Sequence, residues 1–311
     1  MPRRRLLAVV GPTASGKTAL AVELARRLDG EIVNADSRQV YRGMDIGTAK
    51  PTLAERAAAR HWLIDVFDPD APCSLADFLD GARAAMDDIW SRGRLPILCG
   101  GTGQYVWALL EAWRVPRVPP DHTLRAEFQQ RAVRDGADAL AEDLRNIDPA
   151  SAAAIDPRNV RRVIRAIEVT RATGRPFSEW RRRGAAPFAA TVLGLHVDRA
   201  ELHHRIDRRV DAMIAAGLVG EVRALNRAGY GCDLPAMLAI GYREICDYLR
   251  GSCPLEEAIA RIKTGTHRLA RMQSTWFRAN DPRITWLEAT AADLLSRATA
   301  AARVEPSGSG D

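Results

Sequence analysis

Apolar and polar residues alternate in blocks along the first third of the chain, in a pattern that predicts strands separated by helices. Short apolar runs typical of buried strands occur at Leu6–Val10, Glu31–Ala35, Leu63–Val66 and Leu95–Cys99. Between them, Thr18–Leu28 and Ala76–Trp90 carry apolar residues at helical spacing. This alternation favours an α/β fold, with a parallel sheet flanked by helices and ligands bound beyond the carboxyl ends of the strands.

The pattern changes after Trp113. Residues 115–120 form a proline-rich connector, and the sequence from there to about Gly184 is helical without a strand candidate. A strand over Thr191–Val197 then returns to the sheet, followed by helices over Ala200–Ala215, Leu218–Ala228 and about Leu255–Arg278. We therefore expect a core over residues 1–115 and 188–302, an inserted all-helical lobe over 116–187, and a disordered tail over 303–311.

A phosphate-binding motif follows the first strand. The template G-x-x-x-x-G-K-T is filled by Gly11, Pro12, Thr13, Ala14, Ser15, Gly16, Lys17 and Thr18. A strand, a glycine turn and a helix start aim backbone N–H groups at one anion, Lys17 adds a full charge, and the Thr18 hydroxyl is placed to bind Mg²⁺. Of 45 Lys and Arg residues only three are lysines, so the lysine kept here indicates that a compact ammonium is needed. The motif predicts phosphate or diphosphate binding.

A second polar segment follows the second strand. Residues 36–51 read DSRQVYRGMDIGTAKP, which is too rich in polar residues and glycine for a simple connection. Asp36, at the tip of that strand and beside the anion site, could assist Mg²⁺ or accept a proton from a nucleophile. A role as a helix N-cap remains the alternative on the sequence alone.

The charge balance favours a polyanionic partner. The chain has 311 residues and a formal net charge of +6, which by itself does not distinguish RNA from DNA or from no polyanionic partner. Between Arg158 and Arg183, nine arginines face two acidic residues, with Phe177 and Trp180 as candidate base-stacking partners. The helical lobe is therefore the candidate nucleic-acid surface.

Cysteine usage and the chain's hydrophobicity predict a cytoplasmic protein. The five cysteines show no metal-ligand spacing, so we expect free thiols in a reducing compartment. The basic N-terminus leads into only five apolar residues before the phosphate motif, so it is not a signal peptide, and no run is long enough to cross a membrane.

Taken together, these segments resemble the tRNA dimethylallyltransferases, also called tRNA isopentenyltransferases. The resemblance extends from Gly11 to about Arg278 and includes GPTASGKT (11–18), DSRQVYRGMDIGTAKP (36–51), GGTGQY (100–105), RRVIRAIEV (161–169), GLVGEVRAL (217–225), IGYRE (240–244) and QSTWFR (273–278). It implies a P-loop NTPase-like core and transfer of a dimethylallyl group from dimethylallyl diphosphate to the exocyclic amine of an adenine next to the anticodon. Leu238, His267 and Met272 depart from the family's usual residues.

The resemblance also implies roles for single residues. The diphosphate would be the leaving group, stabilised by Lys17, the loop N–H groups, Arg209 and Mg²⁺ held on Thr18. Asp36 would accept or orient the amine proton, and Thr102 would hydrogen-bond near the transferred carbon or the adenine, with loop capping as its alternative role.

The implied partners are dimethylallyl diphosphate and the anticodon stem-loop of tRNA, with no membrane and no protein partner. The residues expected to contact tRNA are Asp36, Ser37, Arg38, Gln39, Thr102, Arg125, Arg161, Arg162, Val163, Ile164, Arg165, Gly241, Tyr242, Arg243, Arg271, Gln273 and Arg278. Within residues 161–165 of this set, we expect the side chains of Val163 and Ile164 to face the core of the lobe. Arg261, Arg268, Arg271 and Arg278 fall within a sector of about 100° on one helix, whereas Trp276 and Phe277 are expected in the core.

Two other functions fit parts of the sequence. A nucleoside or small-metabolite kinase shares the strand–loop–helix start, but does not need a large basic insertion; ATP turnover with a small acceptor would identify it. A P-loop RNA-binding switch without covalent chemistry would show nucleotide-dependent RNA affinity and no modified base.

Overall fold

The computed structural model describes residues 4–180 and 184–304 and contains a six-stranded, fully parallel sheet. The strands are β1 (Arg5–Val10), β2 (Gly30–Asn34), β3 (His61–Trp62), β4 (Leu95–Gly100), β5 (Ala189–His196) and β6 (Ile284–Glu288), in the order β3-β2-β4-β1-β5-β6. At the centre, Val9 of β1 pairs with Cys99 on one side and Leu193 on the other. The parallel α/β fold is confirmed, and the carboxyl ends of all strands open at one edge.

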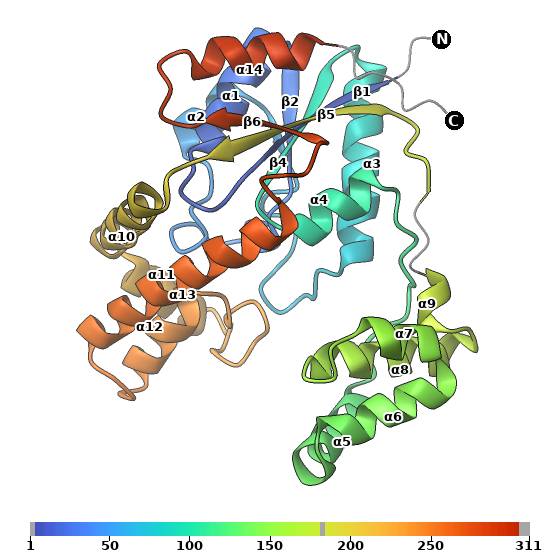
Figure 1. Ribbon diagram of the computed structural model, residues 1–311. Helices are drawn as coiled ribbons and strands as arrows, with labels where there is room; N and C mark the ends of the chain where they lie inside the picture. Colours follow the sequence, from blue (N-terminus) through green and yellow to red (C-terminus); the bar gives the residue numbers. More distant parts are fainter. Residues whose placement is uncertain (1–3, 181–183, 305–311) are drawn as a thin grey trace. The chain divides into compact units, whose positions relative to one another are not determined.

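Helices cover both faces of this sheet (Figure 1). Those of the sheet-containing unit are α1 (Lys17–Arg27), α2 (Leu53–Ala58), α3 (Leu75–Ser91), α4 (Gly103–Leu110), α10 (Arg199–Ala215), α11 (Leu218–Arg227), α12 (Tyr242–Leu249), α13 (Leu255–Trp276) and α14 (Leu294–Arg303). Helices α1 and α14 lie on one face and α3 on the other. Helices α10–α13 gather beyond the carboxyl ends of the strands, where they build a second hydrophobic core with residues 40–44.

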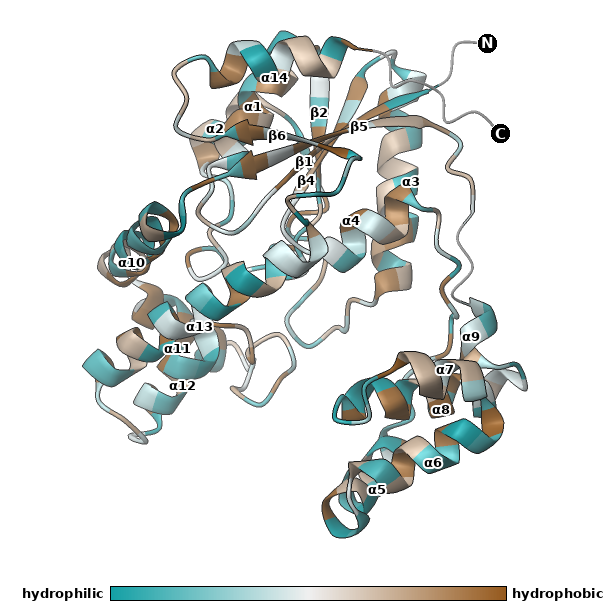
Figure 2. Cartoon of the chain, in the orientation of Figure 1, coloured by the Kyte–Doolittle hydropathy of each residue, from teal (hydrophilic) through white to brown (hydrophobic). Residues whose placement is uncertain are grey.

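Burial of apolar side chains fixes the first helix on the sheet. Leu20 and Leu24 of α1 pack with Leu7 and Val9 of β1 in one buried cluster, to which α14 adds Ala298. Figure 2 shows hydrophobic residues concentrated on the strands and hydrophilic ones along α10 and α13. The phosphate motif therefore joins two elements that are both anchored in the core.

One expected strand is absent, and one observed strand was not expected. The strand predicted at Leu63–Val66 is wrong: β3 ends at Trp62, and the chain then turns through Leu63 and Asp65, whose φ angles are 61° and 58°. A left-handed backbone cannot continue a strand, however apolar its side chains are. Conversely, β6 was not predicted, because its short pattern of buried and exposed residues gives a weak signal on an edge strand.

Residues 111–185 form a separate compact unit made of helices in its described part. These are α5 (His122–Asp135), α6 (Ala137–Ile147), α7 (Pro149–Ala154), α8 (Val160–Thr173) and α9 (Phe177–Trp180). Its core contains Phe128, Leu140, Leu144 and Ile167. Of the expected tail, Arg303 closes α14, and residues 305–311 lie outside the described residues.

Cys232 and Cys246 form a disulfide, with their Cα atoms 5.9 Å apart. The expectation of five free thiols is wrong for this pair. The sequence could not show it, because the pairing depends on how the loop before α12 folds back on that helix. Cys73, Cys99 and Cys253 are free. Within residues 4–180 and 184–304, no helix combines the length and hydrophobicity that a membrane crossing requires.

The buried carboxylate of Glu31 ties β2 to its neighbours and generates a stability prediction. Its side chain is 1% exposed and accepts hydrogen bonds from Arg92 (2.9 Å), Arg94 (2.6 Å) and the Trp62 indole N–H (2.8 Å). The bonds from Arg92, more than any other contact, lower the pKa of Glu31 to about 2.

We expect Glu31→Gln to reduce the free energy of unfolding at pH 7 by on the order of 2 kcal/mol. A depressed carboxyl pKa stabilises the fold above the unfolded value near 4.5, and this stabilisation is lost as the pH falls towards 2. Urea unfolding at several pH values should therefore show the wild type and the variant converging below pH 4. A constant difference down to pH 2.5 would contradict this role.

Candidate active site

The phosphate loop presents an uncapped helix start. Gly16 is the N-cap of α1, with φ 92°, and no side chain caps the helix. In contrast, α2 and α3 begin with complete capping boxes. The first N–H groups of α1 are thus left without side-chain acceptors, and the helix dipole adds partial positive charge there. A left-handed Gly16 makes this geometry accessible, since a side chain at that φ would be strained.

Two cations converge on this loop. Lys17 Nζ donates to the Pro12 carbonyl at 3.1 Å, and Arg209 Nη1 of α10 donates to Thr13 Oγ1 at 3.3 Å. Burial lowers the pKa of Lys17, although Cys99 and Asp36 act to raise it, and burial also lowers the pKa of Arg209. Among the described residues neither cation has a carboxylate ion-pair partner. Positive charge withdrawn from water without a counter-ion favours an anionic ligand.

One cavity of about 740 Å³ brings the predicted chemistry together. It is lined by Lys17, Thr18, Asp36, Thr102 and Arg209, and hence by the ends of β1, β2 and β4 together with α10. Five residues expected at the site therefore line a single cavity.

Asp36 and Thr102 each make local bonds at that edge. Asp36 Oδ1 accepts the Arg38 N–H at 2.8 Å, and Thr102 Oγ1 accepts the Ser37 N–H at 3.1 Å. The N–H of Thr102 donates to the Ala35 carbonyl at 3.2 Å. Thr102 therefore holds the ends of β2 and β4 together. Gly100 permits this approach, because a Cβ there would lie 2.2 Å from the Ala35 carbonyl oxygen.

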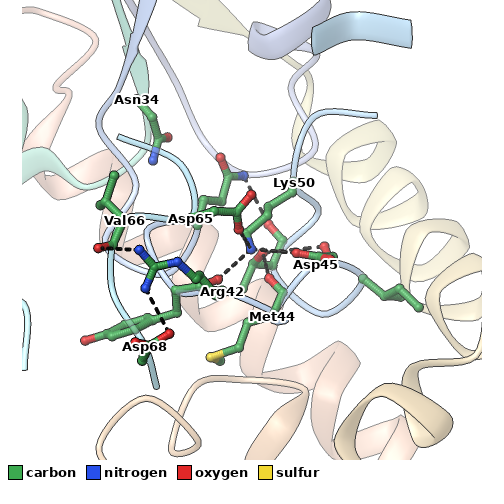
Figure 3. A network of polar contacts seen from close by, with 12 residues as sticks. Asn34, Arg42, Met44, Asp45, Lys50, Asp65, Val66 and Asp68 are labelled. Atoms are coloured by element: carbon green, nitrogen blue, oxygen red, sulfur yellow. Dashed lines mark hydrogen bonds and ion pairs between the residues drawn. The ribbon is translucent and has the colours of Figure 1, made fainter. Parts of the chain in front are cut away.

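A buried lysine organises the polar segment that follows Asp36. Lys50, with a side chain 4% exposed, donates to the Tyr41 carbonyl and forms ion pairs with Asp45 (2.6 Å) and Asp65 (2.5 Å). Figure 3 shows Lys50 between these two carboxylates. Beside it, Arg42 bonds Val66 and Asp68. This second retained lysine is structural, since it closes residues 41–50 into a loop.

A carboxylate that the sequence reasoning missed anchors the same loop. Glu221 of α11 accepts the N–H groups of Asp45, Ile46 and Gly47 at 3.0, 2.7 and 3.2 Å, and the Tyr242 hydroxyl at 2.6 Å. A Cβ on Gly47 would lie 2.4 Å from the Tyr242 ring. The only sequence signal was an acidic residue inside the GLVGEVRAL segment.

Helix α13 differs from expectation at two positions. Gln273 is buried rather than exposed: its Oε1 accepts the Thr13 N–H at 2.8 Å and its Nε2 donates to the Gly101 carbonyl at 3.0 Å. Trp276 was expected in the core, but it is 41% exposed and lines the cavity. It sits against Gly103, where a Cβ would lie 2.3 Å from the indole. Phe277 is buried as expected.

The other predicted tRNA contacts of the sheet-containing unit vary in accessibility. Ser37, Arg38, Gln39 and Gly241 line the cavity, and the basic residues Arg271 and Arg278 are exposed. Tyr242 is fully buried, so its side chain is unavailable to RNA. Gln39 donates to the carbonyls of Thr48 and Ala49, Arg38 donates to the Pro235 carbonyl, and Arg243 pairs with Glu244.

In the helical unit, two arginines that were predicted to contact RNA form ion pairs with a buried carboxylate. Glu168, 2% exposed, accepts from Arg125 at 2.8 Å, from Arg165, and from the Asp121 N–H at 2.7 Å. Despite its burial, these bonds lower the pKa of Glu168.

The remaining predicted residues of this unit divide by the face of α8 on which they lie. Val163 and Ile164 are buried as expected, so their side chains cannot contact RNA. Arg161 and Arg162 lie exposed on the same helix. Of the nine arginines, those at 181–183 lie outside the described residues, and Arg158 and Arg175 pair with nearby acids. Of the described arginines in this stretch, Arg158, Arg165 and Arg175 are therefore engaged by acidic side chains.

The donor set fits a magnesium ion that is bound chiefly by substrate phosphates. The described residues contain no group of three His, Cys, Asp or Glu side chains that could hold a metal alone. Thr18 supplies a hydroxyl beside the phosphate loop, with Asp36 lining the same cavity. Mg²⁺ commonly uses one or two protein oxygens together with waters and phosphate oxygens.

Comparisons with known proteins match most of the chain to one family. A family model described as "IPP transferase" matches residues 39–280, and one described as "Isopentenyl transferase" matches residues 4–67. A tRNA dimethylallyltransferase of Roseiflexus sp. (strain RS-1) is 53% identical, covering 96% of this chain and 97% of its own. The corresponding protein of Thermomicrobium roseum is 52% identical, covering 93% and 87%.

Solved structures give the same result. The tRNA isopentenylpyrophosphate transferase of Bacillus halodurans is 43% identical, with a TM-score of 0.71, covering 96% of this chain and 95% of its own. A eukaryotic dimethylallyltransferase acting on tRNA is 28% identical, with a TM-score of 0.76, covering 92% and 74%.

Lys17→Ala should weaken binding of inorganic diphosphate by roughly 10–100-fold, because a hydrogen bond to a charged group contributes about 1.5–3 kcal/mol. Isothermal titration calorimetry would measure the change. Lys263→Ala is the matched control, since Lys263 pairs with Asp211 and does not line the cavity. Equal effects of the two substitutions would argue against a specific anion site at the loop.

Proposed function

This chain belongs to the tRNA dimethylallyltransferase family, and from that premise we propose its reaction and the residues that perform it. The enzyme transfers the dimethylallyl group of dimethylallyl diphosphate to the exocyclic N6 amine of the adenine next to the anticodon and releases diphosphate. The observation that carries this proposal is the shared cavity at the carboxyl edge of the sheet, which is lined by Lys17, Arg209 and the carboxylate of Asp36. We place the reaction in the cytoplasm, where tRNA is available.

Stabilisation of the leaving group is the first requirement. As the carbon–oxygen bond breaks, its electron pair stays with the diphosphate and negative charge grows there. The uncapped N–H groups of α1, the ammonium of Lys17 and the guanidinium of Arg209 lie where they can stabilise this charge. Thr18 would hold Mg²⁺, which supplies further positive charge on the phosphate oxygens when it is bound.

Activation of the acceptor is the second requirement. The N6 amine is a weak nucleophile because its lone pair is delocalised into the purine ring. As N6 bonds to the allylic carbon, one N–H proton must leave. We assign its acceptance to Asp36, since Glu55, another carboxylate that lines the cavity, is engaged in the capping box of α2. Thr102, fixed by its bond from the Ser37 N–H, offers a hydroxyl at the same edge.

Recognition of the tRNA involves the exposed basic residues. To enter the cavity, the adenine must leave its stack in the tRNA. This costs a few kcal/mol, less in a loop than in a duplex. Contacts to phosphates can offset this cost, and Arg161, Arg162, Arg271 and Arg278 are the predicted contacts that lie exposed.

Asp36→Asn should reduce prenyl transfer by about 10²–10⁴-fold, the usual contribution of a positioned base, while diphosphate affinity changes less than about twofold. Asparagine keeps the oxygen that accepts the Arg38 N–H, so the local turn is preserved. Transfer is measured with radiolabelled dimethylallyl diphosphate and unmodified tRNA, followed by nucleoside analysis. A loss of diphosphate affinity equal to the loss of activity would contradict the base role.

Affinity for tRNA should fall steeply with salt, because phosphate contacts release counter-ions. Removing the exposed Arg161 with alanine should reduce the slope of log K against log salt by about 1. Arg134→Ala is the control from the same helical unit, since Arg134 is held by Asp135. Filter binding between about 50 and 200 mM salt measures this slope. An unchanged slope for Arg161→Ala would show that Arg161 does not contact the tRNA phosphates.

A further inference from the structure

A chain of polar contacts crosses the site and runs through one side chain of α13. The Gln273 amide donates from Nε2 to the Gly101 carbonyl and accepts at Oε1 from the Thr13 N–H, at 3.0 and 2.8 Å. Thr13 in turn accepts at Oγ1 from Arg209. Four segments are thereby linked in sequence: the turn after β4, helix α13, the phosphate loop and helix α10.

The amide can satisfy both contacts in only one orientation. A carbonyl needs a donor and an N–H needs an acceptor, so Nε2 must face Gly101 and Oε1 must face Thr13. Gly101 leaves room for this arrangement, because a Cβ there would lie 2.3 Å from Nε2. Gln273 is only 8% exposed, which leaves little surface for contact with another molecule.

The position of Gln273 on its helix separates it from the basic residues. At 100° per residue, Gln273 lies roughly opposite Arg268 and Arg271, whereas Arg278 lies beyond the end of the helix at Trp276. The arginines are exposed and the amide is buried, so α13 presents different chemistry on two faces.

We propose that Gln273 is a positioning residue: it holds the phosphate loop and the Gly101–Thr102 turn in register, so that the diphosphate and the acceptor edge keep a fixed separation. The inference rests on the proposed function, and it replaces the expectation that this residue contacts tRNA. Because it holds the Thr13 backbone, the same amide also positions the Thr13 hydroxyl, which accepts a hydrogen bond from Arg209. Gln273 also lines the cavity, but its positioning role acts through the backbone of both segments.

Gln273→Glu provides the sharpest test because it keeps size and the acceptor facing Thr13, but places an oxygen against the Gly101 carbonyl. We expect kcat to fall by about 10–100-fold, as small misplacements of reacting groups do, with the tRNA dissociation constant within about twofold of the wild type. The difference in kcat between the wild type and Gln273→Glu should become smaller as the pH falls, since a protonated carboxyl can again donate to the Gly101 carbonyl. Gln273→Met, which can make neither bond, should lose kcat without this pH-dependent recovery.

Two further variants secure the interpretation. Ser274→Ala is the matched control, since its exposed hydroxyl bonds only the Ala270 carbonyl of its own helix. Gly101→Ala should reproduce the kcat loss by displacing the amide without altering Gln273, and it tests the inference if the Gln273 variants fail to fold.

The outcomes separate the inference from the proposed function. If the wild type transfers no prenyl group to tRNA, the proposed function fails. If the wild type is active and Gln273→Glu weakens tRNA binding at unchanged kcat, Gln273 is an RNA contact and the positioning role is overturned. A Gln273→Glu variant with wild-type kcat and wild-type tRNA affinity would also overturn the positioning role.

Discussion

Positive charge that forms no ion pair with a carboxylate among residues 4–180 and 184–304 is the constraint around which the cavity is arranged. The ammonium of Lys17 and the guanidinium of Arg209 are largely withdrawn from solvent beside the open start of α1, and burial lowers the pKa of both groups. Such an arrangement is unfavourable without an anion. The fold supports it because α1 is anchored by Leu20 and Leu24 in the central core, while α10 delivers Arg209 from a second core.

Another part of the cavity wall, residues 47–51, depends on polar anchors. Lys50 holds residues 41–50 closed through Asp45 and Asp65, and Glu221 accepts three consecutive backbone N–H groups of the same loop. Loops that carry functional side chains are commonly fixed on a rigid scaffold in this way. Because residues 47–51 line the cavity, these ion pairs and hydrogen bonds determine the shape of that wall.

Much of this could be predicted from sequence where a local pattern coincides with a local structure. The strands at Leu6–Val10 and Leu95–Cys99 and the phosphate loop followed directly, since apolar runs and glycine turns act through neighbouring residues. Partners far away in the chain could not be predicted: the Cys232–Cys246 disulfide, the three N–H groups bound by Glu221, and the burial of Gln273 depend on tertiary contacts. Trp276 illustrates the same limit, because an aromatic residue at helical spacing does not reveal whether core or cavity lies beside it.

The contact between Gly47 and Tyr242 has a consequence for how related sequences can diverge. The ring occupies the space that any side chain at position 47 would need, while its hydroxyl bonds Glu221. These two positions should therefore covary. A lineage could gain a methyl group at 47 only by accepting a smaller residue at 242, and it would then have to find another donor for the carboxylate.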